Sequence, residues 1–132
     1  MRIDHVAIAV NNVEEAVKTF EKVLKIDKKQ IMTVENEKVK MAMLQLEDTR
    51  IEIMEPTSDY SPIKKFLLEN GEGIHHISIC ADDIESDVNK ALQNGLKILG
   101  GIRAGSYGRK VTFIHPKSLH GVLMELCDPH EE

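Results

Sequence analysis

The sequence predicts an α+β fold in which two pseudo-symmetric βαβββ modules form a curved mixed sheet around a central metal site. Three observations lead to this prediction. The segment around His5 returns 71 residues later around His76, with a similar pattern of apolar and polar neighbours. The segment around Glu52 returns 73 residues later around Glu125. Within each half, apolar residues recur first at strand spacing, then at helix spacing, and then at strand spacing again.

Length and charge limit the class of protein. The 132 residues make one domain, which the repeat divides into module one (about 1–56), a linking helix (about 62–70) and module two (about 73–129). The net charge of −5, with lysines and arginines scattered, argues against a nucleic-acid or membrane-surface partner, because these need a concentrated basic face.

The cysteines and the hydropathy pattern indicate the compartment. Cys80 and Cys127 stand in apolar strand patterns without the spacing of a metal or redox motif, which indicates buried, reduced thiols. The sequence contains no basic leader and no apolar run of ~18 residues. We therefore expect a cytoplasmic protein.

The elements of module one follow from the spacing of its apolar residues. Alternating polarity and β-branched side chains predict an opening strand, on which His5 shares a face with Ala7. Asn12 followed by Glu15 is typical of a helix N-cap with an acidic first turn. In chain order, the module is predicted as a strand at 3–10, a helix ending near residue 25, a linking piece through residue 31, and strands at 38–46 and 49–55.

Module two follows a linking helix that starts at Ser61 and Pro62 and stops at Gly71. From that helix onward, the predicted elements are the linking helix at 62–70, a strand at 74–81, a helix at 83–94, a short strand at 97–99, a glycine-rich loop at 100–108, and strands at 110–115 and 122–126. Module two is therefore interpreted as a strand, a helix and three strands, and the repeat predicts the same plan for each half.

Four polar side chains interrupt the repeated strands: His5, Glu52, His76 and Glu125. Because a strand presents alternate side chains to opposite faces, all four can point into one concave face if the halves pack pseudo-symmetrically. A single inward histidine is more often a hydrogen-bonded core residue, but a buried glutamate without a partner would cost several kcal/mol. Two imidazoles and two carboxylates suit Co²⁺, Mn²⁺, Ni²⁺, Fe²⁺ or Zn²⁺ and leave positions open for a chelating substrate.

Nearly the whole chain resembles the vicinal oxygen chelate superfamily, and within it the methylmalonyl-CoA epimerase family. The resemblance includes the segments Gly-Glu-Gly-Ile-His-His and His-Pro-Lys-Ser, and it is carried by residues 3–10, 48–56, 71–77, 113–118 and 121–126. It implies paired βαβββ modules and places the superfamily's ligands on the same four residues that the repeat selects. The implied activity is metal-dependent epimerisation of (2R)- and (2S)-methylmalonyl-CoA, by removal of the C2 proton to give a metal-stabilised enediolate.

The resemblance also implies roles for individual residues. Glu125 would be the catalytic base as well as a metal ligand, with Co²⁺ as the first choice of metal and Mn²⁺, Ni²⁺ or Zn²⁺ as alternatives. Lys117 and Ser118 would bind the acyl-CoA substrate, although a solvated turn after a strand is the competing interpretation of that segment. A homodimer is implied because members of the superfamily commonly pair.

The chain departs from the family at Met41, where some epimerases have a second glutamate. Inversion at a carbon is simplest with one proton-carrying group on each face. A thioether cannot carry a proton, so the second group is left open between a water molecule, Glu35 and Glu37. Residues 105–109, which contain two glycines, are interpreted as a mobile flap over the substrate or as an ordinary loop.

Two other functions fit parts of the sequence. A glyoxalase I-like lactoylglutathione lyase has a similar ligand quartet, but the epimerase-like segments favour an acyl-CoA substrate. A non-catalytic module, like the bleomycin-binding members of the superfamily, tends to lack the quartet and to line its groove with aromatic side chains. This chain has three phenylalanines, two tyrosines and no tryptophan, so the epimerase interpretation is preferred.

Overall fold

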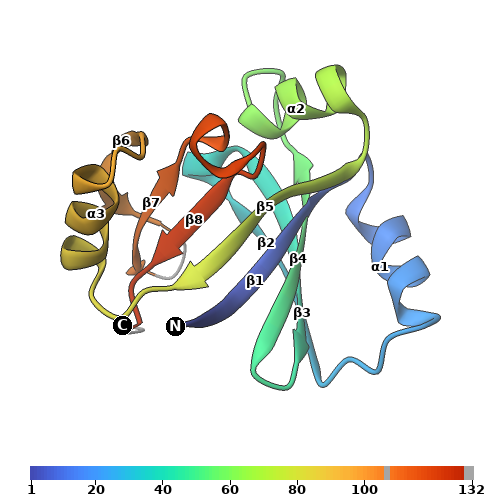
Figure 1. Cartoon of the computed structure of the whole chain (residues 1–132). Helices are drawn as coiled ribbons and strands as arrows, with labels where there is room; N and C mark the ends of the chain where they lie inside the picture. Colours follow the sequence, from blue (N-terminus) through green and yellow to red (C-terminus); the bar gives the residue numbers. More distant parts are fainter. Residues whose placement is uncertain (106–107, 130–132) are drawn as a thin grey trace. The chain divides into compact units, whose positions relative to one another are not determined.

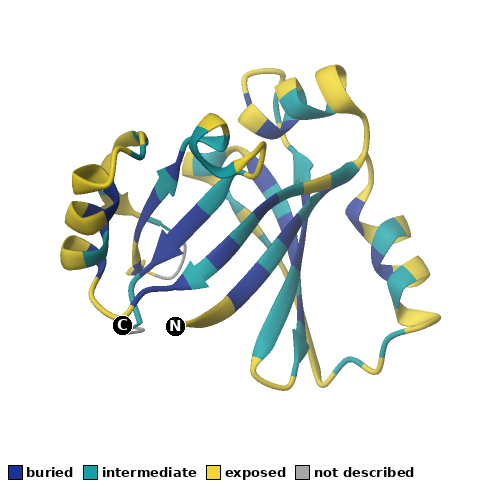
Figure 2. Ribbon diagram, in the orientation of Figure 1, coloured by how far each residue is buried: buried dark blue, intermediate teal, exposed yellow. Residues whose placement is uncertain are grey.

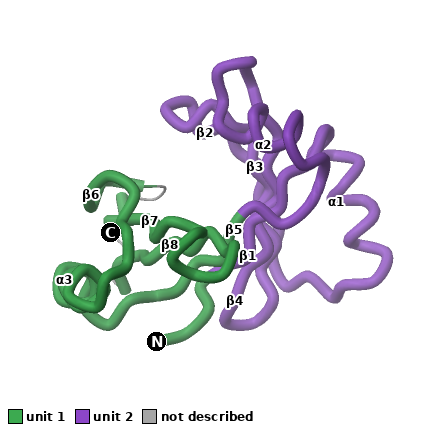
Figure 3. Tube along the Cα trace, turned by 45° about the horizontal axis from the view of Figure 1, so that its top comes forward, with its two compact units in different colours: residues 1–4, 76–132 green, residues 5–75 purple. Residues whose placement is uncertain are grey.

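The computed structural model describes residues 1–105 and 108–129, and these contain eight β-strands and three α-helices (Figure 1). Strand pairs are both parallel and antiparallel, so the predicted α+β class with a mixed sheet is confirmed. The chain divides into two compact units, His5–His75 on one side and Met1–Asp4 with His76–Glu132 on the other (Figure 3). None of the helices in the described ranges has the length and apolar character needed to cross a membrane.

The unit His5–His75 holds four strands and two α-helices. In chain order its elements are β1 (Arg2–Ala9), α1 (Val13–Glu21), β2 (Lys28–Val34), the 3₁₀ helix η1 (Glu35–Glu37), β3 (Val39–Leu46), β4 (Thr49–Pro56) and α2 (Pro62–Asn70). The strand order is β2-β3-β4-β1, with β4 parallel to β1 and β3 antiparallel to both of its neighbours. Asn12 starts α1, because its side-chain oxygen accepts the backbone N–H of Glu15 at 2.9 Å, as the sequence predicts.

The two faces of this sheet are covered by different helices. On one face, Val13 and Val17 of α1 pack against Ile53 of β4. On the other face, Ile63 of α2 belongs to an apolar cluster that also contains Ala7 of β1, and Figure 2 shows the buried positions along these strands. Strand alternation puts His5 on the same face as Ala7, two residues before it along β1.

The second unit repeats this plan. In chain order its elements are β5 (Gly73–Cys80), α3 (Ile84–Gln93), β6 (Ile98–Ala104), β7 (Lys110–Ile114), the 3₁₀ helix η3 (Pro116–Leu119) and β8 (Met124–Cys127). The strand order β6-β7-β8-β5 corresponds to β2-β3-β4-β1, with the parallel pair at the matching place. Ile84 and Val88 of α3 pack on Leu126 in the apolar core. The predicted repeat of two βαβββ modules is therefore confirmed.

A buried ion pair ties the first residues of the chain into this second unit. Asp4 is 1% exposed and Arg109 is 4% exposed. Nη1 of Arg109 donates to Oδ1 of Asp4 at 3.0 Å, and Nη2 donates to Sγ of Cys127 at 3.2 Å. Burial alone would lower the pKa of Arg109, but the hydrogen bond and charge of Asp4 raise it above its ordinary value. Cys127, like Cys80, is a buried free thiol, as predicted.

Three details of the predicted elements are wrong. β2 (Lys28–Val34) occupies part of the predicted linking piece; its residues are mostly exposed at the edge of the sheet, so it lacks a clear apolar alternation. β6 (Ile98–Ala104) runs through a glycine pair that was predicted as loop, because its pairing with β7 shifts register inside the strand. α1 ends at Glu21 instead of near residue 25, since Val23 is 80% exposed and contributes nothing to the core face.

Candidate functional site

The first unit holds a buried histidine and a buried glutamate close together. In the parallel pair of β1 and β4, Ala7 is the partner of Glu52 and His5 is the partner of Arg50. His5 and Glu52 are each 6% exposed, and Nδ1 of His5 lies 3.4 Å from Oε2 of Glu52. A carboxylate beside Nδ1 favours the tautomer with its proton on Nδ1, which directs metal binding to Nε2.

Arg50 contacts the same carboxylate oxygen. Its Nη2 donates to Oε2 of Glu52 at 3.3 Å, and its side chain is only 12% exposed. Alternation in the sequence places Arg50 on the face of Glu52, but its position beside His5 depends on the pairing of β1 with β4. Sequence reasoning therefore missed its contact with the candidate ligand.

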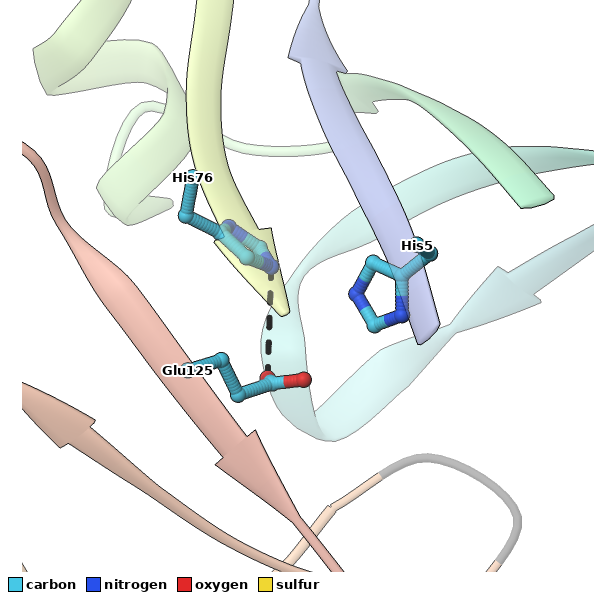
Figure 4. Close-up of side chains that lie close together, drawn as sticks. All are labelled: His5, His76 and Glu125. Carbon is cyan, nitrogen blue, oxygen red and sulfur yellow. Dashed lines mark ion pairs between the residues drawn. The ribbon is translucent and has the colours of Figure 1, made fainter. Parts of the chain in front are cut away.

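The second unit holds the matching pair, His76 on β5 and Glu125 on β8 (Figure 4). Nε2 of His76 lies 3.9 Å from Oε2 of Glu125, and both side chains are buried. The fully buried Ser78 hydroxyl donates to Oε1 of Glu125 at 2.7 Å. The ring of Phe113 meets the ring of His76 edge to face, with 5.4 Å between centroids. Sequence reasoning missed Ser78, although its spacing of two residues from His76 puts both side chains on one face.

The two pairs occupy equivalent places within their units. Ala7 is the strand partner of Glu52, and Ser78, its counterpart in the repeat, is the strand partner of Glu125. Each pair offers an imidazole nitrogen and a carboxylate oxygen in surroundings from which most water is excluded. Buried carboxylates need positive charge nearby, and mixed nitrogen and oxygen donors fit a divalent first-row transition metal.

The predicted substrate-binding residues lie on η3 (Pro116–Leu119). The Ser118 hydroxyl accepts the backbone N–H of Lys97 at 3.0 Å, so it anchors the start of β6. The backbone N–H of Lys117 is held by Nδ1 of His115 at 3.0 Å, while the Lys117 side chain is exposed. This geometry leaves the Lys117 ammonium group accessible to an anion.

The position where a second glutamate was sought is apolar. Met41 is 1% exposed, is the strand partner of Met54, and belongs to the apolar cluster beneath α2. The two alternatives lie on η1: Glu35 is exposed and Glu37 is partly buried. Of the predicted flap, residues 106–107 lie outside the described residues, and Arg109 is held in its buried ion pair with Asp4.

A family model described as the Glyoxalase/Bleomycin resistance protein/Dioxygenase superfamily matches residues 4–113. The chain belongs to this superfamily. Its relatives in the superfamily include a mitochondrial methylmalonyl-CoA epimerase from Dictyostelium discoideum, which is 37% identical over 127 residues, covering 95% of this chain and 76% of the relative. An ethylmalonyl-CoA/methylmalonyl-CoA epimerase from Cereibacter sphaeroides is 34% identical over 128 residues, covering 95% of this chain and 96% of the relative.

Solved structures of superfamily members agree with these relatives. A substituted methylmalonyl-CoA epimerase from Streptomyces coelicolor, in complex with 2-nitronate-propionyl-CoA, superimposes with a TM-score of 0.89 at 33% identity. The match covers 97% of this chain and 96% of that one. The resemblance to the epimerase family is therefore confirmed, and the named relatives and this structural neighbour are isomerases.

Proposed function

We propose that the chain catalyses the metal-dependent epimerisation of (2R)- and (2S)-methylmalonyl-CoA. The observation that carries this proposal is the buried histidine and glutamate pair that recurs at equivalent strand positions in both units. The epimerases among its relatives support the substrate class.

The proposed metal ligands are His5, Glu52, His76 and Glu125, with Co²⁺ as the first metal to test and Mn²⁺, Ni²⁺ and Zn²⁺ as alternatives. When bound, a divalent ion would supply positive charge to the substrate carboxylate and thioester carbonyl, which stabilises the negative charge left by the departing C2 proton. The imidazole of His5 would bind through Nε2, because Glu52 lies beside Nδ1.

Glu125 is the proposed base. Its Oε1 is held by the Ser78 hydroxyl at 2.7 Å, so the carboxylate has a fixed orientation and Oε2 is the oxygen turned toward His76. A carboxylate held in one orientation can take a proton from one face of C2 only. Met41 offers no proton carrier, so the opposite face requires a water molecule, Glu35 or Glu37.

The exposed Lys117 is the proposed contact for an anionic group of the CoA moiety. Ser118 would contribute indirectly. Its hydroxyl accepts the backbone N–H of Lys97 and so fixes the position of the segment that carries Lys117. We also keep three predictions from the sequence: the chain is one domain, it forms a homodimer, and it is located in the cytoplasm.

The proposal is tested by deuterium wash-in at C2 of methylmalonyl-CoA in D₂O, with protein stripped of metal and then reloaded with Co²⁺. We expect exchange and inversion only after reloading, and a loss of about 10²–10⁴-fold in Glu125→Gln, the usual contribution of a positioned base. Glu85→Gln is the matched control, because Glu85 pairs with Lys110 at 3.1 Å on the surface, with more than half of each side chain exposed. If Glu125→Gln and Glu85→Gln exchange the C2 proton at the same rate, Glu125 is not the base.

If the reloaded protein leaves the C2 proton in place, the epimerase proposal fails. Glyoxalase I-like chemistry then becomes the next assay, with methylglyoxal and glutathione as substrates. Ethylmalonyl-CoA should be compared in the same exchange experiment, since one relative is named for both acyl-CoA esters.

A further inference from the structure

We propose that Arg50 balances the charge of the metal centre, so that a site with two glutamates still attracts a carboxylate substrate. This inference rests on the proposed function and assigns a specificity-determining role to a residue outside the ligand quartet. Its physical basis is the contact between Arg50 and Glu52.

The geometry makes Arg50 a neighbour of both candidate ligands on the first unit. Arg50 is the strand partner of His5, and its Nη2 donates to Oε2 of Glu52 at 3.3 Å. The Arg50 side chain is 12% exposed and that of Glu52 is 8% exposed, so little water screens the pair. A largely buried guanidinium at this distance offsets the negative charge of the carboxylate.

The fold itself does not require an arginine at this place. Arg50 stands two residues before Glu52, and the second module has Leu123 two residues before Glu125. Leu123 is partly buried in a unit with the same strand order. An apolar side chain therefore suits this position in the module even beside a buried glutamate. Neither the fold nor a single carboxylate demands the arginine, and its effect is to add one positive charge to the proposed centre as a whole.

The charges of the proposed centre can be added. A divalent ion (+2) with Glu52 and Glu125 (−2) gives zero, and Arg50 brings the sum to +1. A neutral centre attracts a carboxylate more weakly than a centre of +1 does, and the centre of +1 also stabilises better the extra negative charge of the deprotonated substrate. Arg50 thus determines how strongly the centre prefers an acyl-CoA with a carboxylate over one without.

The test uses the variants Arg50→Gln, Arg50→Lys, Glu52→Gln and the double variant Arg50→Gln with Glu52→Gln. Two dissociation constants are measured for the full chain: that of Co²⁺, by competition with a chelator, and that of malonyl-CoA on the Co²⁺-loaded protein. Propionyl-CoA, which lacks the carboxylate, is the ligand control. Lys110→Gln, which removes an exposed cation, is the matched control variant.

Charge balancing predicts opposite changes in the two constants. Arg50→Gln should bind Co²⁺ about tenfold more tightly and malonyl-CoA about tenfold more weakly, with propionyl-CoA unchanged, the order expected for one unit charge a few ångströms away. Glu52→Gln should change both constants in the reverse direction. The double variant restores the sum of +1, so both constants should return to within about threefold of the parent values, and Arg50→Lys should behave like the parent.

A purely structural role gives a different pattern. If Arg50→Gln weakens Co²⁺, malonyl-CoA and propionyl-CoA alike, and the double variant is no better, the inference is wrong. Arg50→Leu, which copies the second module, replaces Arg50→Gln if the latter fails to fold in thermal unfolding. The Co²⁺ measurements decide the role of Arg50 without any turnover, so they stand even if C2 exchange fails and the epimerase proposal falls.

Discussion

Replacing Arg109 with methionine should be among the most destabilising single changes in the second unit. The substitution removes the guanidinium but keeps a side chain of similar length, and it leaves the Asp4 carboxylate buried at 1% exposure. Breaking a buried ion pair by removing one partner typically costs about 3–5 kcal/mol. Arg2 remains near Asp4, with Nη2 3.6 Å from Oδ1, but its side chain is half exposed. We therefore expect about 3 kcal/mol, or a Tm lowered by roughly 10 °C.

The assay is urea unfolding followed by circular dichroism, with Arg109→Met, Asp4→Asn and the double variant compared in one cycle. The double variant should be more stable than Arg109→Met alone, because no uncompensated charge stays buried. Lys110→Met is the control: Lys110 makes an exposed ion pair with Glu85, so its loss should change the free energy of unfolding by less than about 1 kcal/mol. The reasoning is refuted if Arg109→Met costs no more than Lys110→Met, or if the double variant loses the sum of the single losses.

Three further predictions concern buried or partly buried groups. Ser78→Ala removes the 2.7 Å donor to Glu125 and should lower the C2 exchange rate about tenfold, whereas Ser78→Thr, which keeps a hydroxyl, should restore it. An unchanged rate in Ser78→Ala contradicts the role of this contact. Burial raises the pKa of Cys127 from 9.0 to about 11, so the thiol of the unfolded chain ionises first as the pH rises. The free energy of unfolding should therefore fall between about pH 9 and 11, and Cys127→Ala should reduce that fall. Burial lowers the pKa of His75, so the unfolded chain takes up a proton on this imidazole before the folded protein does, below about pH 6.5. The free energy of unfolding should therefore fall on acidification. Urea unfolding at pH 5 and pH 7 should show a smaller fall in His75→Gln.

The repeated polar positions were the predictable part of the candidate site. A histidine or glutamate in an apolar strand pattern must be buried on one face, and His5, Glu52, His76 and Glu125 are all less than 10% exposed. Alternation and helix caps likewise predicted most elements, including the start of α1 at Asn12. Whether the four side chains share one ion stays a prediction.

The parts that the sequence could not supply depend on strand pairing. Ser78 reaches Glu125, and Arg50 lies beside His5, only because parallel strands far apart in the chain meet in a particular register. The edge strand β2 was missed for a different reason: lysines and glutamine at its start are exposed, so its apolar signal is weak. Pairing and exposure are properties of the assembled sheet, and residue types alone do not carry them.

Strand β1 is divided between the two units, since Arg2–Asp4 belong to one and His5–Ala9 to the other. This division affects the order in which the chain can fold during synthesis. Asp4 leaves the ribosome 105 residues before its buried partner Arg109. A growing chain can therefore complete the contacts within His5–His75 while Met1–Asp4 still lack their own unit. Met1–Asp4 are therefore synthesised before His5–His75 but buried after it, and closure of the second unit requires the chain through Arg109.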